Sequence, residues 1–335
     1  MESLCHQYRE LKKMLKGVEY VEIELSCGRD KGLMDVGIPT YTQVKSYIYR
    51  KGVSLIVNAL KVNSIVTSLD LSYIADLQDE EVSEIAEHLK VNSTLVSLSL
   101  SHLWLEDKAG AKIAEALKLN NSLTSLDLSR NVIGDEGASA IAKALEVNQS
   151  LKLLNLEDNN VGNQGAIAIA NALEVNHSLK LLNLEDNKVG DQGAVAIAEA
   201  LKVNSSLTSL NLSKNWLGKD GLSKIAEVLK VNSSLMSLNI GRNTLQPDFA
   251  AAILVNALKE NVSLKSLTLR HSLRVKAPQI TKQMKSNHSL KSLDLSMNDL
   301  GGEGAAEIAE WLKVNSCLES LNIGYNSFGD VGASA

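Results

Sequence analysis

Residues 122–148 read SLTSLDLSRNVIGDEGASAIAKALEVN, and the chain repeats this segment twice more with few changes. Residues 150–176 read SLKLLNLEDNNVGNQGAIAIANALEVN, and residues 178–204 read SLKLLNLEDNKVGDQGAVAIAEALKVN. A segment that recurs at a fixed period indicates a repeat architecture, in which each copy forms one small structural unit. We therefore expect the fold to follow from the local structure of one repeat and from the stacking of successive repeats.

The first half of each repeat predicts a strand followed by a turn. Each full copy begins L-x-x-L-x-L-x-x-N, and alternating leucines such as Leu126 and Leu128 place both side chains on one face of a strand. Asn131 follows where the chain must turn, and its amide can both donate and accept hydrogen bonds there. The leading apolar residues of the copies are Val66, Leu95, Leu123, Leu151, Leu179, Leu207, Leu235, Leu264, Leu290 and Leu318.

The second half of each repeat predicts a helix. Ile141, Ala142 and Leu145 recur at helical spacing and give this helix one apolar face. We expect Asp135 to cap the start of the helix and Asn148 to end it in the left-handed conformation that asparagine tolerates. One such unit cannot bury its apolar face alone, so the repeats must stack.

Stacking of these units predicts a curved fold. Neighbouring strands lie about 4.8 Å apart, whereas packed helices need about 8–10 Å. The mismatch predicts an α/β fold, a right-handed βα solenoid bent into a horseshoe with a concave parallel sheet and convex helices.

This pattern resembles the leucine-rich repeat family, and in particular its long, helix-containing ribonuclease-inhibitor-like subclass. The resemblance extends from about residue 53 to residue 335. Similar proteins include ribonuclease inhibitors, the sensing domains of NOD-like receptors, Ran GTPase-activating proteins and leucine-rich repeat effectors of intracellular bacteria. The resemblance implies a scaffold that grips other macromolecules, and the fold alone does not choose among these functions.

The chain is expected to have two parts. Residues 1–52 hold a capping helix at 1–19, a degenerate repeat whose strand, Tyr20–Leu25, pairs with the first repeat strand, and a loop at 26–42. The chain then returns to helix from Gln43 to Leu60.

Residues 53–335 form a solenoid of about ten repeats, the last one incomplete. We expect a kink near residues 270–280, because Ser272 replaces the turn asparagine and Pro278 interrupts the helical half. Because the chain stops at Ala335 inside the last repeat, we expect either a truncated chain or a final edge covered by something else.

Composition narrows the function classes. The net charge of −5 argues against a nucleic-acid surface, and the sequence lacks an apolar run of about 18 residues that could span a membrane. The scattered Cys5, Cys27 and Cys317 give neither a disulfide framework nor a metal-ligand set, and they fit a reducing cytosol. Eight N-x-S/T motifs fall at helix-ending asparagines, which we interpret as structural: Asn92, Asn120, Asn148, Asn176, Asn204, Asn232, Asn261 and Asn287.

The sequence predicts no catalytic residues, no cofactor and no metal site. The glycine pairs at the helix starts lack the lysine of a phosphate-binding loop. Partner binding is instead expected at the strand ends, on polar, charged and aromatic residues that the core does not fix. These residues are Tyr73, His102, Trp104, Arg130, Glu157, Asp158, Glu185, Asp186, Lys214, Trp216, Arg242 and Tyr325.

The middle of this surface is predicted to be acidic. Adjacent strands would place Glu157 and Glu185 about 5 Å apart, and a basic segment of a partner protein would relieve their repulsion. We therefore expect a monomeric, non-enzymatic protein-binding scaffold of the cytosol, with an effector acting in the cytosol of a host cell as one form. A Ran-type GTPase-activating protein and a ligand-sensing fragment of a NOD-like receptor are the alternatives.

Overall fold

The computed structural model describes residues 21–26, 41–46, 50–61, 63–74, 77–244, 247–272 and 287–333. Its contacts divide the chain into two compact units, residues 1–159 and residues 160–335, and each is described by itself. The predicted helix at 1–19, most of the predicted loop at 26–42 and the predicted kink around Pro278 lie outside the described residues.

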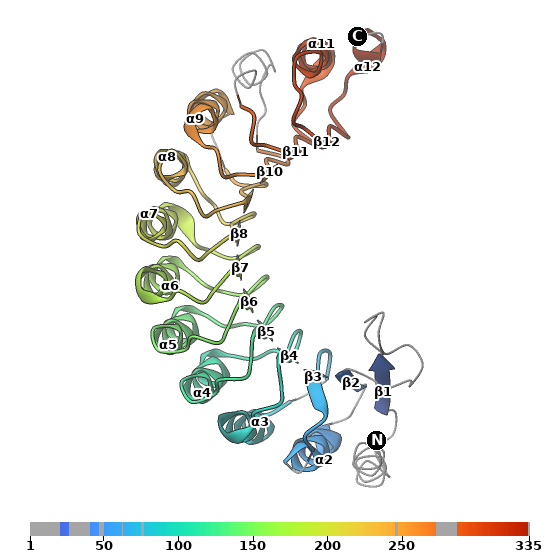
Figure 1. Ribbon diagram of the computed structural model, residues 1–335, viewed down its shortest axis with the longest axis vertical. Helices are drawn as coiled ribbons and strands as arrows, with labels where there is room; N and C mark the ends of the chain where they lie inside the picture. The colour runs from blue at the N-terminus through green and yellow to red at the C-terminus, as the bar shows by residue number, and fades with distance from the viewer. Residues whose placement is uncertain are drawn as a thin grey trace, which may run out of the picture. The chain divides into compact units, whose positions relative to one another are not determined.

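Unit 1 consists of strands that alternate with helices, and Figure 1 shows its strands and its helices in two separate layers. Its strands are β1 (Val21–Ser26), β2 (Tyr41–Ser46), β3 (Val66–Asp70), β4 (Ser97–Ser99), β5 (Ser125–Asp127) and β6 (Leu153–Asn155). Its helices are α2 (Arg50–Leu60), α3 (Asp79–Val91), α4 (Asp107–Leu117) and α5 (Asp135–Leu145).

Unit 2 continues the same alternation. Its strands are β7 (Leu181–Asn183), β8 (Ser209–Asn211), β9 (Ser237–Asn239), β10 (Ser266–Thr268), β11 (Ser292–Asp294) and β12 (Ser320–Asn322). Its described helices are α6 (Asn163–Val175), α7 (Gly190–Leu201), α8 (Lys219–Leu229), α9 (Pro247–Glu260), α11 (Gly301–Leu312) and α12 (Gly329–Ala333).

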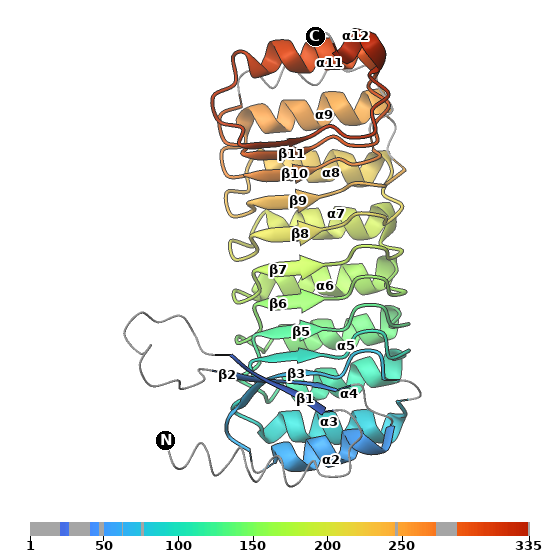
Figure 2. The ribbon, with the colours of Figure 1, turned by 90° about the vertical axis from the view of Figure 1, so that its right-hand side faces the viewer.

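The repeat strands pair in parallel and in constant register. In unit 1, Leu98 lies between Leu69 and Leu126 on the neighbouring strands. The inward side chains Leu128 and Ile141 are fully buried between the strand layer and the helix layer. Figure 2 views the strands with the helices of the same repeats behind them. The predicted fold class, a βα solenoid with parallel strands, is thereby confirmed for each unit.

The N-terminal strands of unit 1 depart from two predictions. β1 does not pair with the first repeat strand: it pairs antiparallel with β2, from Val21 opposite Ser46 to Ser26 opposite Tyr41. The segment predicted as helix from Gln43 onward begins as strand, and the helix starts at Arg50. Because β2 pairs in parallel with β3, it takes the place beside the first repeat that we had assigned to β1.

The turn asparagine bonds each repeat to the one before it. Asn131 Nδ2 donates to the carbonyl oxygens of Leu100 and Leu128, both at 2.9 Å. Its Oδ1 accepts from the backbone N–H groups of Leu103 and Leu105, both at 3.0 Å. A net gain of about 1 kcal/mol is typical for each such bond. The same contacts to neighbouring repeats recur at Asn159, Asn215, Asn243, Asn298 and Asn326.

The helix-ending asparagines form a second series of such bonds. Asn148 Nδ2 donates to Leu117 O at 2.7 Å and to Asn120 O at 2.9 Å, both in the preceding repeat. Its Oδ1 accepts from the N–H groups of Ser150 and Leu151, which lead into the next strand. Equivalent bonds to the preceding repeat are made by Asn120, Asn204, Asn232, Asn261 and Asn287.

The predicted left-handed backbone at these helix ends is wrong. Asn176, for example, has φ −83° and ψ 122°, an extended conformation, and Asn148 has no positive φ. The extended backbone carries the chain directly toward the next strand while the side chain satisfies the carbonyls left by the preceding helix. The structural interpretation of the N-x-S/T motifs is supported, because seven of these eight asparagines are buried: Asn120, Asn148, Asn176, Asn204, Asn232, Asn261 and Asn287.

The helix starts also differ from prediction. Asp135 is the first residue of α5 and does not cap it, since Gly134 occupies the N-cap position. Asp107 of the preceding repeat provides the cap: its Oδ1 accepts from Gly134 N at 2.7 Å and from Gly137 N at 2.8 Å. A Cβ atom at Gly137 would lie 2.8 Å from this oxygen, so only glycine allows the approach.

The same cap recurs in unit 2. Asp191 Oδ1 accepts from the N–H groups of Gly218 and Gly221, both at 2.8 Å. At the equivalent position of α6, Asn163 Oδ1 accepts from Gly193 N at 3.3 Å. A carboxylate at a helix start also complements the helix dipole, which an asparagine does only weakly.

One buried histidine interrupts the apolar helix layer. His88 is 5% exposed and stands where the other repeats carry small residues such as Ala116 and Val228. Neither ring nitrogen has a hydrogen-bond partner among the residues that the structure describes. Burial, with a smaller contribution from the charge of Lys61, lowers the pKa of His88 below its ordinary value of 6.5.

Among the residues with described structure, no helix is both long and apolar enough to cross a membrane.

Asp107→Ala is expected to lower the free energy of unfolding by about 1–2 kcal/mol, because two N–H groups at the start of α5 lose their acceptor. Asp107→Asn should lose less, since Asn163 shows that an amide oxygen can fill this position. Urea unfolding followed by circular dichroism measures both variants. Equal stability of the alanine variant and the wild type would contradict the capping role.

His88 should make the fold acid-sensitive. Because its pKa is lowered in the folded state, the unfolded chain binds more protons once the pH falls below about 6.5. Stability is therefore expected to be full above that pH and to decline as the pH falls further. His88→Leu, which removes both unpartnered nitrogens, should reduce the stability difference between pH 7 and pH 5 in urea unfolding. Parallel losses in the variant and the wild type would contradict this.

Candidate partner-binding surface

One residue in each repeat, just before the turn-asparagine position, has a left-handed backbone. We call these residues the turn row; their φ angles lie between 51° and 64°. In unit 1 the turn row consists of Tyr73, His102, Arg130 and Asp158. In unit 2 it consists of Asp186, Lys214, Arg242, His271, Met297 and Tyr325.

Hydrogen bonds between repeats impose this conformation. Arg130 N donates to Glu157 O of the next repeat at 2.7 Å, and the following Asn131 is held by its side-chain bonds. The chain can make both sets of contacts only by reversing its direction at the residue between strand and turn. The side chain of Arg130 itself is exposed.

Bulky residues are disfavoured on a left-handed backbone, yet this surface carries several. Tyr73 and Tyr325 of the turn row are 58% and 83% exposed. Trp104 and Trp216 lie two residues after turn-row positions, have φ angles of 59° and 58°, and are 73% and 63% exposed. Residues held in a disfavoured backbone conformation are candidates for a functional constraint, and exposed aromatic residues are common anchors of protein interfaces.

In unit 1 the rings of Tyr73 and Trp104 lie near a third ring, that of His102. The ring centroids of Tyr73 and His102 are 4.7 Å apart with an interplanar angle of 33°. Those of His102 and Trp104 are 6.5 Å apart, with the rings edge to face. We call these three residues the aromatic cluster.

Comparison with known protein families identifies the repeats. The family model described as "Leucine Rich repeat" matches residues 119–142, 147–170, 175–198, 203–226, 286–309 and 314–335. This chain is a leucine-rich repeat protein. A search of curated proteins finds no significant match.

One solved structure of low sequence identity agrees with the fold of this leucine-rich repeat protein. A structure described as "Crystal structure of Rad7 and Elc1 complex in yeast" is 17% identical, covers 84% of this chain and 68% of that chain, and gives a TM-score of 0.57. At that identity the likeness concerns the fold alone. A structure described as "Leiomodin-1 Actin-Binding Site 2 (ABS2)" is 25% identical, covers 45% of this chain and 88% of that chain, and gives a TM-score of 0.40.

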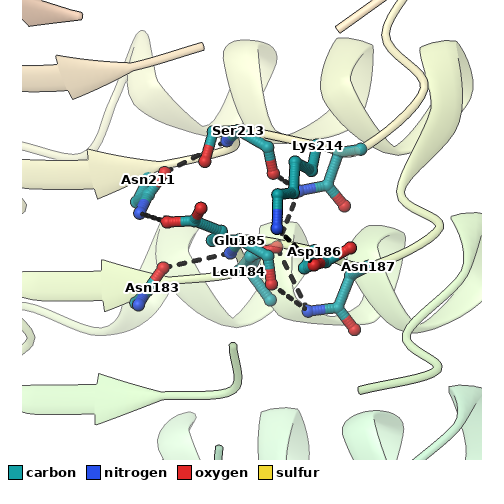
Figure 3. Close-up of polar contacts among 9 residues, drawn as sticks. Asn183, Leu184, Glu185, Asp186, Asn187, Asn211, Ser213 and Lys214 are labelled. Carbon is teal, nitrogen blue, oxygen red and sulfur yellow. Dashed lines mark hydrogen bonds and ion pairs between the residues drawn. The ribbon is translucent and has the colours of Figure 1, made fainter. Parts of the chain in front are cut away.

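In unit 2 of the leucine-rich repeat protein, the two predicted acidic residues have internal partners. Lys214 Nζ pairs with Asp186 Oδ2 at 2.6 Å, and Asn211 Nδ2 donates to Glu185 Oε2 at 2.9 Å. Figure 3 shows both contacts, together with the bond from Glu185 N to Asn183 Oδ1. The sequence analysis placed Lys214 among the partner-binding residues, and the structure pairs it with one of the predicted acids.

In unit 1 the predicted charged residues lie at the ends of β5 and β6. Arg130 and Asp158 are exposed turn-row residues, and Glu157 is half-buried beside Asp158. Glu157 and Glu185 belong to different units, so their predicted proximity remains a prediction. In unit 2, Arg242 is an exposed turn-row residue after β9.

Sequence reasoning found most of this surface but not its backbone. Tyr73, His102, Arg130, Asp158, Asp186, Lys214, Arg242 and Tyr325 were selected as strand-end residues, and the structure shows that they share one conformation. His271 and Met297 belong to the same turn row and were not selected. Their constant offset before the turn position would have identified them. Over the part of the chain that the structure describes, no group of three or more His, Cys, Asp or Glu side chains could hold a metal ion.

The left-handed backbone of the turn row has a measurable consequence at Arg130. Arg130→Asn is expected to be more stable than Arg130→Ala by about 1 kcal/mol, because asparagine tolerates positive φ better than alanine. Lys143, an exposed residue of helix α5, is the control position, where alanine should be the more stable by about 0.5 kcal/mol. Urea unfolding compares the four variants. The same order at both positions would contradict a left-handed Arg130.

Proposed function

We propose that this leucine-rich repeat protein is a non-enzymatic scaffold that binds a partner protein through its strand faces and turn row. The observation that carries the proposal is the set of exposed aromatic residues on left-handed backbone: Tyr73, Trp104, Trp216 and Tyr325. Stability alone would favour glycine or asparagine there. Large side chains kept at a conformational cost are explained by contact with another molecule.

The repeat architecture supports the same function. Turn residues that do not pack in the core can vary without disturbing the stack, so they are free to match a partner. Arg130 illustrates this freedom, since its backbone is bonded to Glu157 O while its side chain is exposed. A rigid frame with variable exposed positions suits recognition of one large surface rather than chemistry on a small substrate.

The finer assignments belong to this proposal as well. We place the repeats in the ribonuclease-inhibitor-like subclass because the 28-residue unit contains a full helix, such as α5 (Asp135–Leu145). We assign the protein to a reducing cytosol, because the three scattered cysteines of the sequence suggest no disulfide framework and the described Cys317 is a free thiol. Action as a monomeric effector inside a host cell is the form of this function that the sequence favours.

The test compares two variants that each replace four exposed apolar residues by asparagine. The variant that we call the turn-row variant carries Tyr73→Asn and Tyr325→Asn in the turn row, and Trp104→Asn and Trp216→Asn two residues after it. The control carries Val91→Asn, Leu119→Asn, Val203→Asn and Val231→Asn, all exposed residues near helix ends. The wild type is expected to capture a protein from a cytosolic lysate that the turn-row variant loses at least about tenfold and the control retains, as measured by quantitative mass spectrometry.

Circular dichroism first confirms that both variants are folded. A partner retained by the turn-row variant, or lost equally from both variants, would reject the turn row as the binding surface. Capture of no protein by the wild type would reject the scaffold function in that lysate's compartment.

A further inference from the structure

The aromatic cluster presents ring faces rather than a closed hydrophobic patch. Tyr73 and Trp104 are more than half exposed, and His102 lies between them at centroid distances of 4.7 and 6.5 Å. All three residues have φ angles near 60°, which direct them away from the core. The faces of Tyr and Trp rings carry partial negative charge and attract cations, above all the planar guanidinium of arginine.

The charges around the aromatic cluster also favour a cationic partner. Asp127, on β5, is half-buried, and its carbonyl oxygen accepts from Leu100 N, two residues before His102 of the cluster, at 2.8 Å. Its Oδ1 accepts from Ser129 N, and no cation pairs with it among the described residues. Glu106 follows Trp104 by two residues. It is exposed and forms no ion pair with another described residue.

Further along this surface, Asp70 ends β3, beside Lys45 in the register of β2, and the exposed Asp158 ends the turn row of unit 1. Arg130 is the one cation in the turn row of unit 1. Of the described charged residues named here, four are carboxylates and two, Lys45 and Arg130, are cations.

We propose that the aromatic cluster of unit 1 binds an extended, arginine-containing segment of the partner protein. One guanidinium stacks on an exposed ring face of the aromatic cluster, that of Tyr73 or that of Trp104, and a second cation along the segment lies against Asp127. The inference rests on the proposed scaffold function and adds the chemistry of what the scaffold binds. The inference concerns unit 1 and not unit 2, because the turn-row carboxylate Asp186 of unit 2 is already paired with Lys214.

The direct test uses two fluorescein-labelled peptides with the intact protein. One peptide is Gly-Ser-Arg-Gly-Arg-Ser-Gly. The other replaces both arginines by citrulline, which keeps the shape and removes the charge. Fluorescence anisotropy at low salt is expected to show binding of the arginine peptide and at least about fivefold weaker binding of the citrulline peptide.

Variants then locate the site. Tyr73→Asn with Trp104→Asn should weaken binding of the arginine peptide about three- to tenfold, whereas Trp216→Asn, at an equivalent left-handed position in unit 2, should leave it unchanged. Asp127→Asn keeps the acceptor for Ser129 N, as Asn155 does for Glu157 N. It should weaken binding about twofold and reduce its salt dependence.

Several results would overturn the inference: equal affinity for the two peptides, no binding at millimolar peptide, or equal losses from the double variant and Trp216→Asn. These failures can be told apart from failure of the scaffold function. If the turn-row variant still loses a captured protein while the arginine peptide is not distinguished, only the cationic chemistry of the partner is wrong.

Discussion

The fold depends on hydrogen bonds between a side chain of one repeat and the backbone of its neighbour. Three positions make them: the turn asparagine, the helix-ending asparagine, and the Asp or Asn at the first turn of the helix. Asn131, Asn148 and Asp107 show the three cases in unit 1. Each satisfies backbone groups that a strand end or a helix end would otherwise leave buried and unpaired. The apolar layer supplies most of the burial, and these bonds fix the offset between repeats.

The exposed surface follows from the same bonds. The turn closes only if the residue before the asparagine position adopts positive φ, and that residue then projects into solvent. Structure and recognition are thus assigned to adjacent positions of one repeat: Asn131 holds the turn, and Arg130 is free to vary. Aromatic and charged side chains at the free position carry the conformational cost of a left-handed backbone.

Much of this fold could be predicted from the sequence, because the period and the L-x-x-L-x-L-x-x-N pattern directly report burial on alternate strand positions. The strand-end residues could be selected for the same reason: they are the positions that the core does not constrain. Asp135 was misassigned because a local capping rule cannot reveal that the acceptor for Gly134 N comes from Asp107, a full repeat earlier.

Other features depend on pairings between segments that the sequence pattern does not report. The antiparallel β1–β2 pair was missed because that segment departs from the repeat. The ion pair between Lys214 and Asp186 joins neighbouring repeats, and sequence alone does not show which of several acids a lysine will reach.

The cap that α5, α7 and α8 each receive from the repeat before them gives the stack a polarity. Asp107 serves the helix that follows it in sequence, and Asp191 does the same in unit 2. A change in length of one or two residues inside a repeat would misalign all three kinds of bond at that interface. Gain or loss of a whole 28-residue module would leave every donor opposite its acceptor. Duplication of whole repeats therefore lengthens this chain with the least disruption of its contacts. The near-identical segments at 150–176 and 178–204 are what such a duplication would produce.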